Sequence, residues 1–144
     1  MFGVTDEEVP PIESSVSDLP PQIDERLPGS LTVAAEARRK LEPFQSLLGS
    51  RRLEVLRLLV NEMVTNSLLH AGALKTGIGL KVEATADVLR VEVTDQGPGF
   101  DPEVSPPPVD QTSGRGLFLV QALSDRWGVI RSGGTMVWAE IDLR

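Results

Sequence analysis

Apolar and polar positions follow a helical period through the middle of the chain. Between residues 51 and 70, five apolar residues recur at three- and four-residue spacings: Leu53, Leu56, Val60, Met63 and Val64. This spacing gathers them on one side of a helix, so the pattern predicts a long amphipathic helix with one buried face. The Ala-Gly pair at residues 71–72 provides a C-terminal stop for this helix.

The period changes to two in residues 77–95. Apolar residues alternate with polar ones on both sides of a turn near residues 84–87: Ile78, Leu80 and Val82 before it, then Leu89, Val91 and Val93 after it. Alternation of this kind predicts a β-hairpin with one buried face. Two further strand-like runs, 127–130 and 135–143, flank a Ser-Gly-Gly turn and predict a second hairpin.

Three shorter elements complete the pattern. An apolar stretch around Leu27 predicts an edge strand. An Ala-rich amphipathic helix is expected up to Leu41, capped by Ser30 or Thr32. A third helix is expected over residues 116–125, because apolar residues again recur there at helical spacing.

These elements predict one domain of the α+β class. Their order is strand, helix, helix, hairpin, loop, helix, hairpin, which indicates a two-layer α/β sandwich with three helices on one face of a mixed, mostly antiparallel sheet. The loop, residues 96–113, is rich in Gly and Pro and cannot form either regular element for long. Loops of that length inside a compact domain are typical of lids and binding loops.

The acidic charge of the chain is concentrated at its N-terminus. Residues 1–25 contain seven acidic side chains and no Lys or Arg, and the other 14 of the 21 acidic residues balance all 14 basic ones. Residues 1–25, which also hold four prolines, are expected to form a disordered leader before a domain at residues 26–144. The alternative is an arm that becomes ordered on a partner. A neutral body argues against direct nucleic-acid binding.

Composition also bounds the compartment and the chemistry. The chain contains no cysteine, so disulfides and thiol chemistry are not available to it. Its sequence has neither an apolar run of roughly 20 residues, as a membrane span needs, nor a secretory pattern at the N-terminus. We therefore expect a cytoplasmic protein without a membrane partner.

Polar side chains interrupt the long helix on one face. Glu62, Asn66 and His70 recur every four residues and so form a stripe. A carboxylate and a carboxamide one turn apart suit a site where the amide oxygen of Asn66 meets a hard cation while Glu62 handles a proton or orients a nucleophile. The alternative is a solvated helix face without chemistry.

A second cluster follows the apolar strand that ends at Asp95. Asp95 is placed to accept hydrogen bonds from the amino group of a ligand. Gly97 and Gly99 allow the backbone to turn closely around a flat ring. Taken alone, the same residues are also those of an ordinary turn.

A third cluster, formed by Gly114, Arg115 and Gly116, precedes the last predicted helix. Backbone N–H groups at a helix N-terminus bind anions, and Arg115 adds positive charge, so the cluster suits phosphates. Glycines before helices are frequent, so this cluster alone does not distinguish a phosphate site from a helix start.

In order and spacing, these clusters resemble the motifs of the GHKL ATPase superfamily over residues 26–144. Four segments match: residues 62–66 the N box, 95–100 the first glycine box, 114–117 the second, and 133–135 the segment that supplies a hydroxyl near adenine. Within the superfamily, the chain is similar to small anti-sigma-factor serine/threonine kinases and actinobacterial ATP-binding regulatory proteins. The resemblance implies a Bergerat-type ATP-binding fold.

The resemblance implies a role for each matching residue. Asn66 would ligate Mg²⁺ that bridges the ATP phosphates, and Glu62 would be the catalytic carboxylate. Asp95 would read the adenine amino group, and Thr135 would support the base. The two glycine boxes would complete the pocket, with Gly97 and Gly99 around adenine and Gly114, Arg115 and Gly116 over the phosphates.

The implied function is that of a Mg-ATP-dependent serine/threonine kinase. It would phosphorylate a small anti-anti-sigma-like antagonist protein and sequester a sigma factor when no unphosphorylated antagonist is available; the family often forms homodimers. No helical domain with a phosphoacceptor histidine is expected before residue 26, so His70 is interpreted as a pocket-rim or helix-end residue. The alternatives are a non-catalytic nucleotide-sensing module that binds a regulatory partner, and a degenerate module that binds neither.

Overall fold

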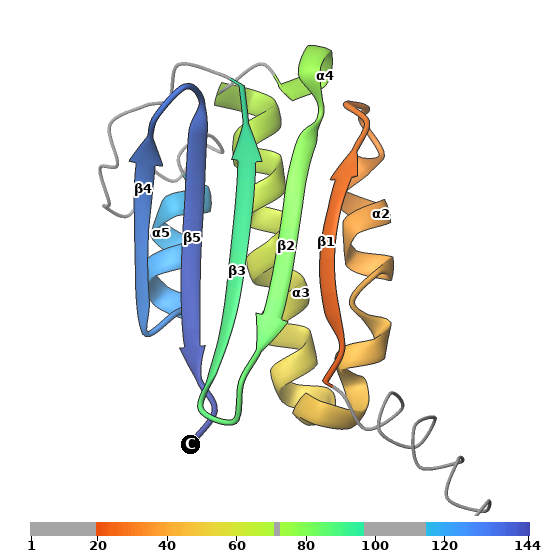
Figure 1. The fold of residues 1–144 in the computed structure, drawn as a ribbon, viewed down its shortest axis with the longest axis vertical. Coiled ribbons are helices and arrows are strands. Elements are labelled where there is room, and N and C mark those ends of the chain that lie inside the picture. The colour runs from red at the N-terminus through yellow and green to blue at the C-terminus, as the bar shows by residue number, and fades with distance from the viewer. Residues whose placement is uncertain (1–19, 71–72, 97–114) are drawn as a thin grey trace, which may run out of the picture.

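The structure, a computed structural model, describes residues 20–70, 73–96 and 115–144. These residues form two layers, a five-stranded sheet with helices on one face (Figure 1). The strands are β1 (Gln22–Leu27), β2 (Ile78–Ala84), β3 (Val88–Asp95), β4 (Arg126–Arg131) and β5 (Thr135–Asp142). The helices are α2 (Val33–Arg39), α3 (Gln45–His70), α4 (Ala73–Thr76) and α5 (Arg115–Leu123), with one 3-10 turn, η2 (Glu42–Phe44). The predicted α+β sandwich is confirmed.

The strands lie in the order β1-β2-β3-β5-β4, and each neighbouring pair is antiparallel. The sequence pattern predicts a mixed, mostly antiparallel sheet. Over the described strands, the sheet is instead wholly antiparallel. The reason is the position of β4, which follows the α5 crossover and runs parallel to β3. It lies at the edge, and β5 returns antiparallel between the two.

Strand β1 begins at Gln22, four residues before the domain boundary expected from composition at residue 26. The strand pairs with β2 from Gln22 opposite Glu83 to Leu27 opposite Ile78. Ile23 and Leu27 both face the core, and this burial holds the start of the strand in the sheet although its other residues are polar. Residues 1–19 of the expected leader lie outside the described residues.

Helix α3 starts earlier than its apolar pattern predicts and contains one interruption. Gly49 has a φ of 79°, a left-handed backbone that glycine adopts without a steric cost. The part after Gly49 corresponds to the helix predicted over residues 51–70, and the turn before it connects η2 to the helix.

No helix in the described ranges is long and apolar enough to cross a membrane.

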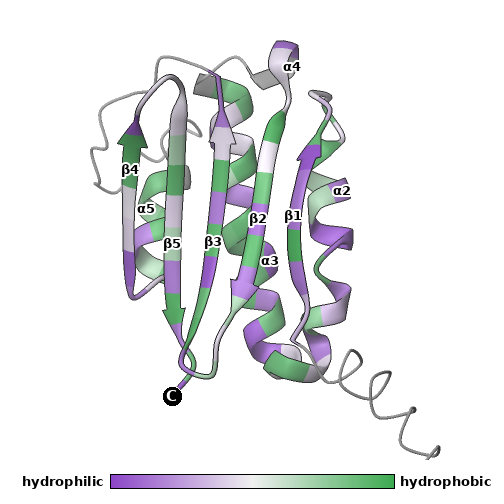
Figure 2. Ribbon diagram, in the orientation of Figure 1, coloured by the Kyte–Doolittle hydropathy of each residue, from purple (hydrophilic) through white to green (hydrophobic). Residues whose placement is uncertain are grey.

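The core lies between α3 and the sheet and extends to α2. Figure 2 shows the bands of alternating hydropathy along the strands and the apolar side of the helices. Among the described residues, the largest fully buried side chain is Phe44 of η2, and the predicted α3 stripe is buried throughout: Leu53, Leu56, Val60, Met63 and Val64. The strands contribute their alternate residues, as the burial of Leu89, Val91 and Val93 on β3 illustrates.

The other face of the sheet carries a ladder of ion pairs. Arg90 on β3 donates a hydrogen bond to Glu140 on β5 at 2.8 Å, and Arg126 on β4 donates to the same carboxylate at 2.9 Å. Arg126 also pairs with Asp142 at 2.5 Å. The Arg90 guanidinium lies 4.6 Å from the ring centre of Trp138, within cation–π distance. The ladder ties together the three strands β3, β5 and β4.

This ladder gives stability a defined pH dependence. Hydrogen bonds from Arg126 lower the pKa of Glu140 and the pKa of Asp142 below their ordinary values of 4.5 and 3.8. Such carboxylates stabilise the fold above the ordinary pKa, and the contribution is lost as pH falls through the folded pKa. The Arg126→Gln variant should therefore have a lower melting temperature than the parent chain at neutral pH. This difference should vanish in acid, once Glu140 and Asp142 are protonated.

Thermal unfolding of both proteins, followed by circular dichroism from neutral pH into acid, measures this difference in melting temperature. Lys81→Gln is a matched control on the same face, because the Lys81 ammonium is 4.0 Å from Glu83 and forms only a weak pair. A melting difference for Arg126→Gln that stays constant into acid would contradict the assignment.

Candidate functional site

Two polar residues predicted from sequence meet at the same end of the sheet. Asp95 is the last residue of β3, Thr135 is the first residue of β5, and the two are paired across the strands. Both are almost fully buried, with 3% and 2% of their surface exposed. Alternation along β3 puts Asp95 on the same face as Val91 and Val93. The carboxylate therefore belongs to the space between the sheet and the helical layer.

The last turns of α3 bring Glu62 and Asn66 to the end of the sheet that carries Asp95. Helix α3 is followed by α4 and then β2, whose Gly79 pairs with Thr94 beside Asp95. Asn66 is buried with 7% of its surface exposed, and Glu62 is half-buried. Neither residue makes a hydrogen bond or ion pair with another residue in the described part of the chain.

Ser67 is a candidate that the sequence pattern missed. It follows Asn66 on α3, is 1% exposed, and its hydroxyl is the one buried side-chain polar atom without a hydrogen-bond partner among the described residues. A buried unpaired hydroxyl is costly, and it points to a missing partner such as a ligand or water. The sequence does contain a signal for Ser67: it is a polar residue four positions after Met63, and so lies on the apolar face of the helix.

Helix α5 begins at the same end of the sandwich. Its C-terminal end leads into β4 at Arg126, which pairs with Glu140 at the far end of the sheet. The nine-residue helix therefore starts on the side of Asp95 (Figure 1). Arg115 and Gly116 form its first turn, although the structure describes only their backbone. The N–H groups of its first turn have no partner within the helix and lie at this end of the fold.

Other predicted positions lie outside the described residues: Gly97, Gly99, Gly114 and the proline-rich part of the loop. His70 is the last residue of α3, and its side chain is likewise not described. These positions remain predictions from the sequence.

A close backbone approach brings the turn after β4 onto Asp95. Gly134 has a φ of 151°, and a Cβ built on it would lie 2.5 Å from the backbone carbonyl oxygen of Asp95. Only glycine fits such a contact, because any side chain would meet backbone rather than a flexible neighbour. Gly134 therefore allows β5 to begin directly beside the end of β3.

A hollow of about 240 Å³ borders this pair of strand ends. It is lined by Thr94, Asp95, Gln96, Ile130, Ser132, Gly133, Gly134, Thr135 and Met136. Thr94, Ile130 and Met136 share one row across the sheet, on the face opposite to Asp95. The hollow thus curves around the end of the sheet, and its lining includes no residue of α3.

The arrangement combines three kinds of group at one end of the fold. Asp95 and Thr135 offer a carboxylate and a hydroxyl for the polar edge of a flat ligand. Asn66 offers an amide oxygen to a hard cation, with Glu62 one turn away. The start of α5 offers N–H groups to an anion. A base, a cation and phosphates are the parts of a magnesium-bound nucleotide.

Comparison with known proteins agrees with this arrangement. Residues 27–141 match the Histidine kinase-like ATPase domain family, and the match includes every described residue of the site. The chain belongs to this family. ATP is the nucleotide that the name of this family implies.

Relatives of this ATPase-family domain carry one recurrent name. It is 28% identical to the serine-protein kinase RsbW of Staphylococcus aureus (strain bovine RF122 / ET3-1), over 80% of this chain and 82% of the relative. The protein of the same name from Staphylococcus epidermidis gives the same values.

A solved structure of the RsbU and RsbW domains of a Mycobacterium tuberculosis protein superposes with a TM-score of 0.62 at 17% identity. The match covers 84% of this chain and 32% of the solved chain, so the family domain spans about a third of that protein. The likeness shows the shared fold.

Substitution of Gly134 tests the close approach at the site. Gly134→Ala should lower the free energy of unfolding by about 1–3 kcal/mol and shift the backbone amide signals of Asp95 and Thr135. Gly133→Ala is the matched control, because Gly133 has a φ of 69° but no atom within 4 Å of a built Cβ. Urea unfolding and amide spectra measure both effects. Equal losses and equal shifts in the two variants would refute a steric role for Gly134.

Proposed function

We propose that this domain binds Mg-ATP between α3 and the end of the sheet and transfers its terminal phosphate to a serine or threonine of a small antagonist protein. The observation that carries the proposal is the placement of three buried polar residues at one end of the fold: Asp95 paired with Thr135 on neighbouring strands, and Asn66 near the C-terminal end of α3. A carboxylate, a hydroxyl and an amide at one end of the fold are the kinds of group that bind the polar parts of a nucleotide.

The magnesium requirement fits the donors present. Mg²⁺ keeps several waters and takes most of its other ligands from substrate phosphates, so one protein oxygen is sufficient. Asn66 offers that oxygen, and no cluster of three or more His, Cys, Asp or Glu that would hold a metal alone occurs among the described residues. When bound, Mg²⁺ would neutralise charge on the phosphates.

The adenine end would be read by the strand termini. Asp95 would accept a hydrogen bond from the adenine amino group, and Thr135 beside it would support the ring. The Ser67 hydroxyl, buried and without a partner in the described ranges, would complete this polar rim directly or through a water. Gly97 and Gly99 would shape the adenine pocket, and Gly114, Arg115 and Gly116 would close over the phosphates.

The kinase activity is proposed from the relatives and from Glu62. The matched staphylococcal proteins are serine-protein kinases by name, and the match extends over most of each relative. Glu62 lies one turn before Asn66, a suitable position for a carboxylate that orients the attacking hydroxyl near a metal-bound phosphate. The partner would be an anti-anti-sigma-like antagonist, with a sigma factor bound in its absence.

Titration of ATP into the purified protein tests the pocket. Asp95→Ala should weaken binding by about 1.5–3 kcal/mol, roughly ten- to hundredfold in Kd, because it removes a hydrogen bond to a charged group. Asn66→Ala should remove the dependence of ATP affinity on Mg²⁺. Asp24→Ala, a strand carboxylate exposed on β1, should leave binding unchanged. Absence of ATP binding by the parent chain would overturn the nucleotide assignment.

A second experiment separates a kinase from a nucleotide-sensing module. Glu62→Gln should lower the rate of phosphate transfer to an antagonist protein about 10²- to 10⁴-fold while ATP affinity stays constant. Label transfer from the terminal phosphate of ATP measures the rate. If the parent chain binds Mg-ATP, regulates its partner and transfers no label, the domain is the non-catalytic sensor instead.

A further inference from the structure

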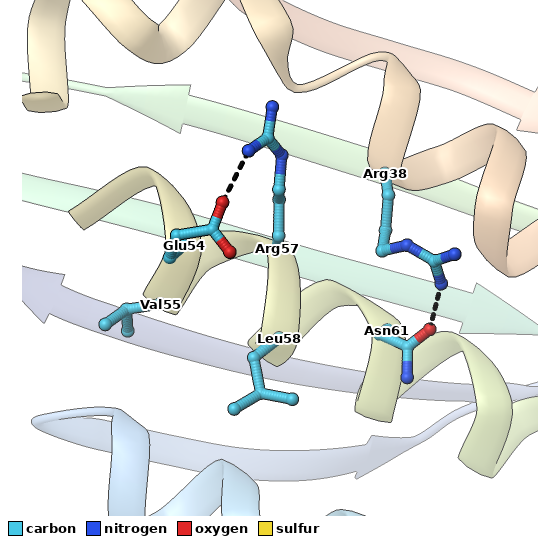
Figure 3. Close-up of a pocket in the computed structure, with 6 residues that line it drawn as sticks. All are labelled: Arg38, Glu54, Val55, Arg57, Leu58 and Asn61. Carbon is cyan, nitrogen blue, oxygen red and sulfur yellow. Dashed lines mark hydrogen bonds and ion pairs between the residues drawn. The ribbon is translucent and has the colours of Figure 1, made fainter. Parts of the chain in front are cut away.

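A groove with an arginine rim runs along the outer surface of the helical layer, over the middle turns of α3, and its lining ends at Asn61, one residue before Glu62. Its larger part, about 560 Å³, is lined by Arg38, Glu54, Val55, Arg57, Leu58 and Asn61. A smaller part of about 260 Å³ continues past Arg38 and Arg57 to Arg39 and Glu42. Figure 3 shows the residues that line the larger part. We name the two parts together the arginine groove.

The groove combines an apolar surface with charge. Val55 and Leu58 of α3 provide the apolar part, and Leu58 keeps 42% of its surface exposed. A single exposed leucine is ordinary on a protein surface, but here it lies inside a concave site beside arginines. An occupant that fits the groove would therefore need both apolar and anionic side chains.

Positive charge exceeds negative charge around the groove. Residues 33–58, which form α2, η2 and the first half of α3, contain six Lys or Arg against three Glu. Arg57 is already paired with Glu54 at 2.6 Å and with Glu42. Arg38 donates a hydrogen bond to Asn61, and four arginines in this stretch make no ion pair with any described residue: Arg38, Arg39, Arg51 and Arg52. Of these, Arg38 and Arg39 line the groove, and Arg39 is exposed to solvent there.

Residues 1–19 of the same chain have the complementary chemistry. They contain five Asp or Glu and no Lys or Arg. Their apolar residues include Ile12, Val16 and Leu19, whose three- and four-residue spacing would gather them on one face of a helix. Acidic and apolar side chains are thus combined in one short segment.

We propose that residues 1–19 dock intramolecularly in the arginine groove. Acidic side chains would face the unpaired arginines, and the apolar row would cover Val55 and Leu58. The segment is attached at the correct place, because Glu25 of the adjoining strand β1 pairs with Lys40 just after α2 at 2.9 Å. Nineteen extended residues span about 60 Å, more than the roughly 39 Å length of α3, so every part of the groove is within reach.

The covalent attachment favours this occupant over an acidic segment of another protein. A tethered segment acts at an effective concentration near millimolar, so even a weak charge-complementary contact is populated. Any partner that uses the arginine groove would have to displace it. The inference does not depend on nucleotide binding, because the groove is distinct from the end of the fold that carries Asp95.

A nitroxide label on the 144-residue chain tests the docking without nucleotide. Because the chain has no cysteine, Ser15→Cys provides a unique attachment point. The amide signals of Arg38, Val55 and Leu58 should lose most of their intensity relative to the reduced label, whereas those of β4 should keep it. High salt should restore the lost signals, since it screens the ion pairs.

Charge reversal on the groove provides the matched comparison. Arg39→Glu, at an exposed position without a described ion pair, should abolish the intensity loss around Leu58. Lys81→Glu makes the same charge change on the opposite face of the sheet and should preserve it. Glu7→Lys with Glu8→Lys changes only the segment, which contributes no described core residue, and should also abolish the loss.

Three outcomes would overturn the proposal. The first is an absence of intensity loss at the groove in the parent chain. The second is equal behaviour of Arg39→Glu and Lys81→Glu. The third is an intensity loss of the same size when spin-labelled, isotope-free protein is mixed with unlabelled, isotope-enriched protein, because the segment would then dock on a second copy.

Discussion

The burial of one apolar stripe on α3 is the constraint on which the rest of the structure depends. This stripe, from Leu53 to Ser67, packs between the sheet and the flanking helices and so fixes the rotation of the helix about its axis. Glu62 and Asn66 each lie one residue before a member of the stripe, Met63 and Ser67. A rotation by one residue, about 100°, would bury the Glu62 carboxylate at a high desolvation cost. Core packing therefore sets the position of the polar pair.

Apolar burial also fixes the register of the strands in the sheet. Because side chains alternate between the two faces, a slip of β5 by one residue would move Thr135 away from Asp95 and expose Val137 and Ala139. The hydrophobic face of β5 thus fixes where its first hydroxyl lies. The close approach of Gly134 to the Asp95 carbonyl allows this register to hold up to the last residue of β3. In both layers, apolar burial positions the polar groups of the candidate site.

Charge that is balanced in composition becomes uneven in space. Beyond the acidic N-terminus, basic and acidic residues are equal in number. On the uncovered face of the sheet they pair with one another, as Arg126 does with Glu140 and Asp142. On the helical layer, Arg39 is among the side chains left without a described partner. The fold separates a self-neutralised surface from one with surplus positive charge, and a sum over the sequence cannot show that difference.

The sequence by itself determined the long helix and the two hairpins, because these follow from local periodicity, and its short motifs predict which residues form the candidate site. Glu62, Asn66, Asp95 and Thr135 were all named from residue spacing and family resemblance, and all four lie at one end of the fold. The tertiary structure decided what depends on contacts distant in sequence. These features are the start of β1 at Gln22, the insertion of β5 between β3 and β4, and the unpaired hydroxyl of Ser67. A local pattern specifies which face of an element is apolar, but the partner that covers this face, and the polar atoms left unpaired beneath it, are set only when the layers pack.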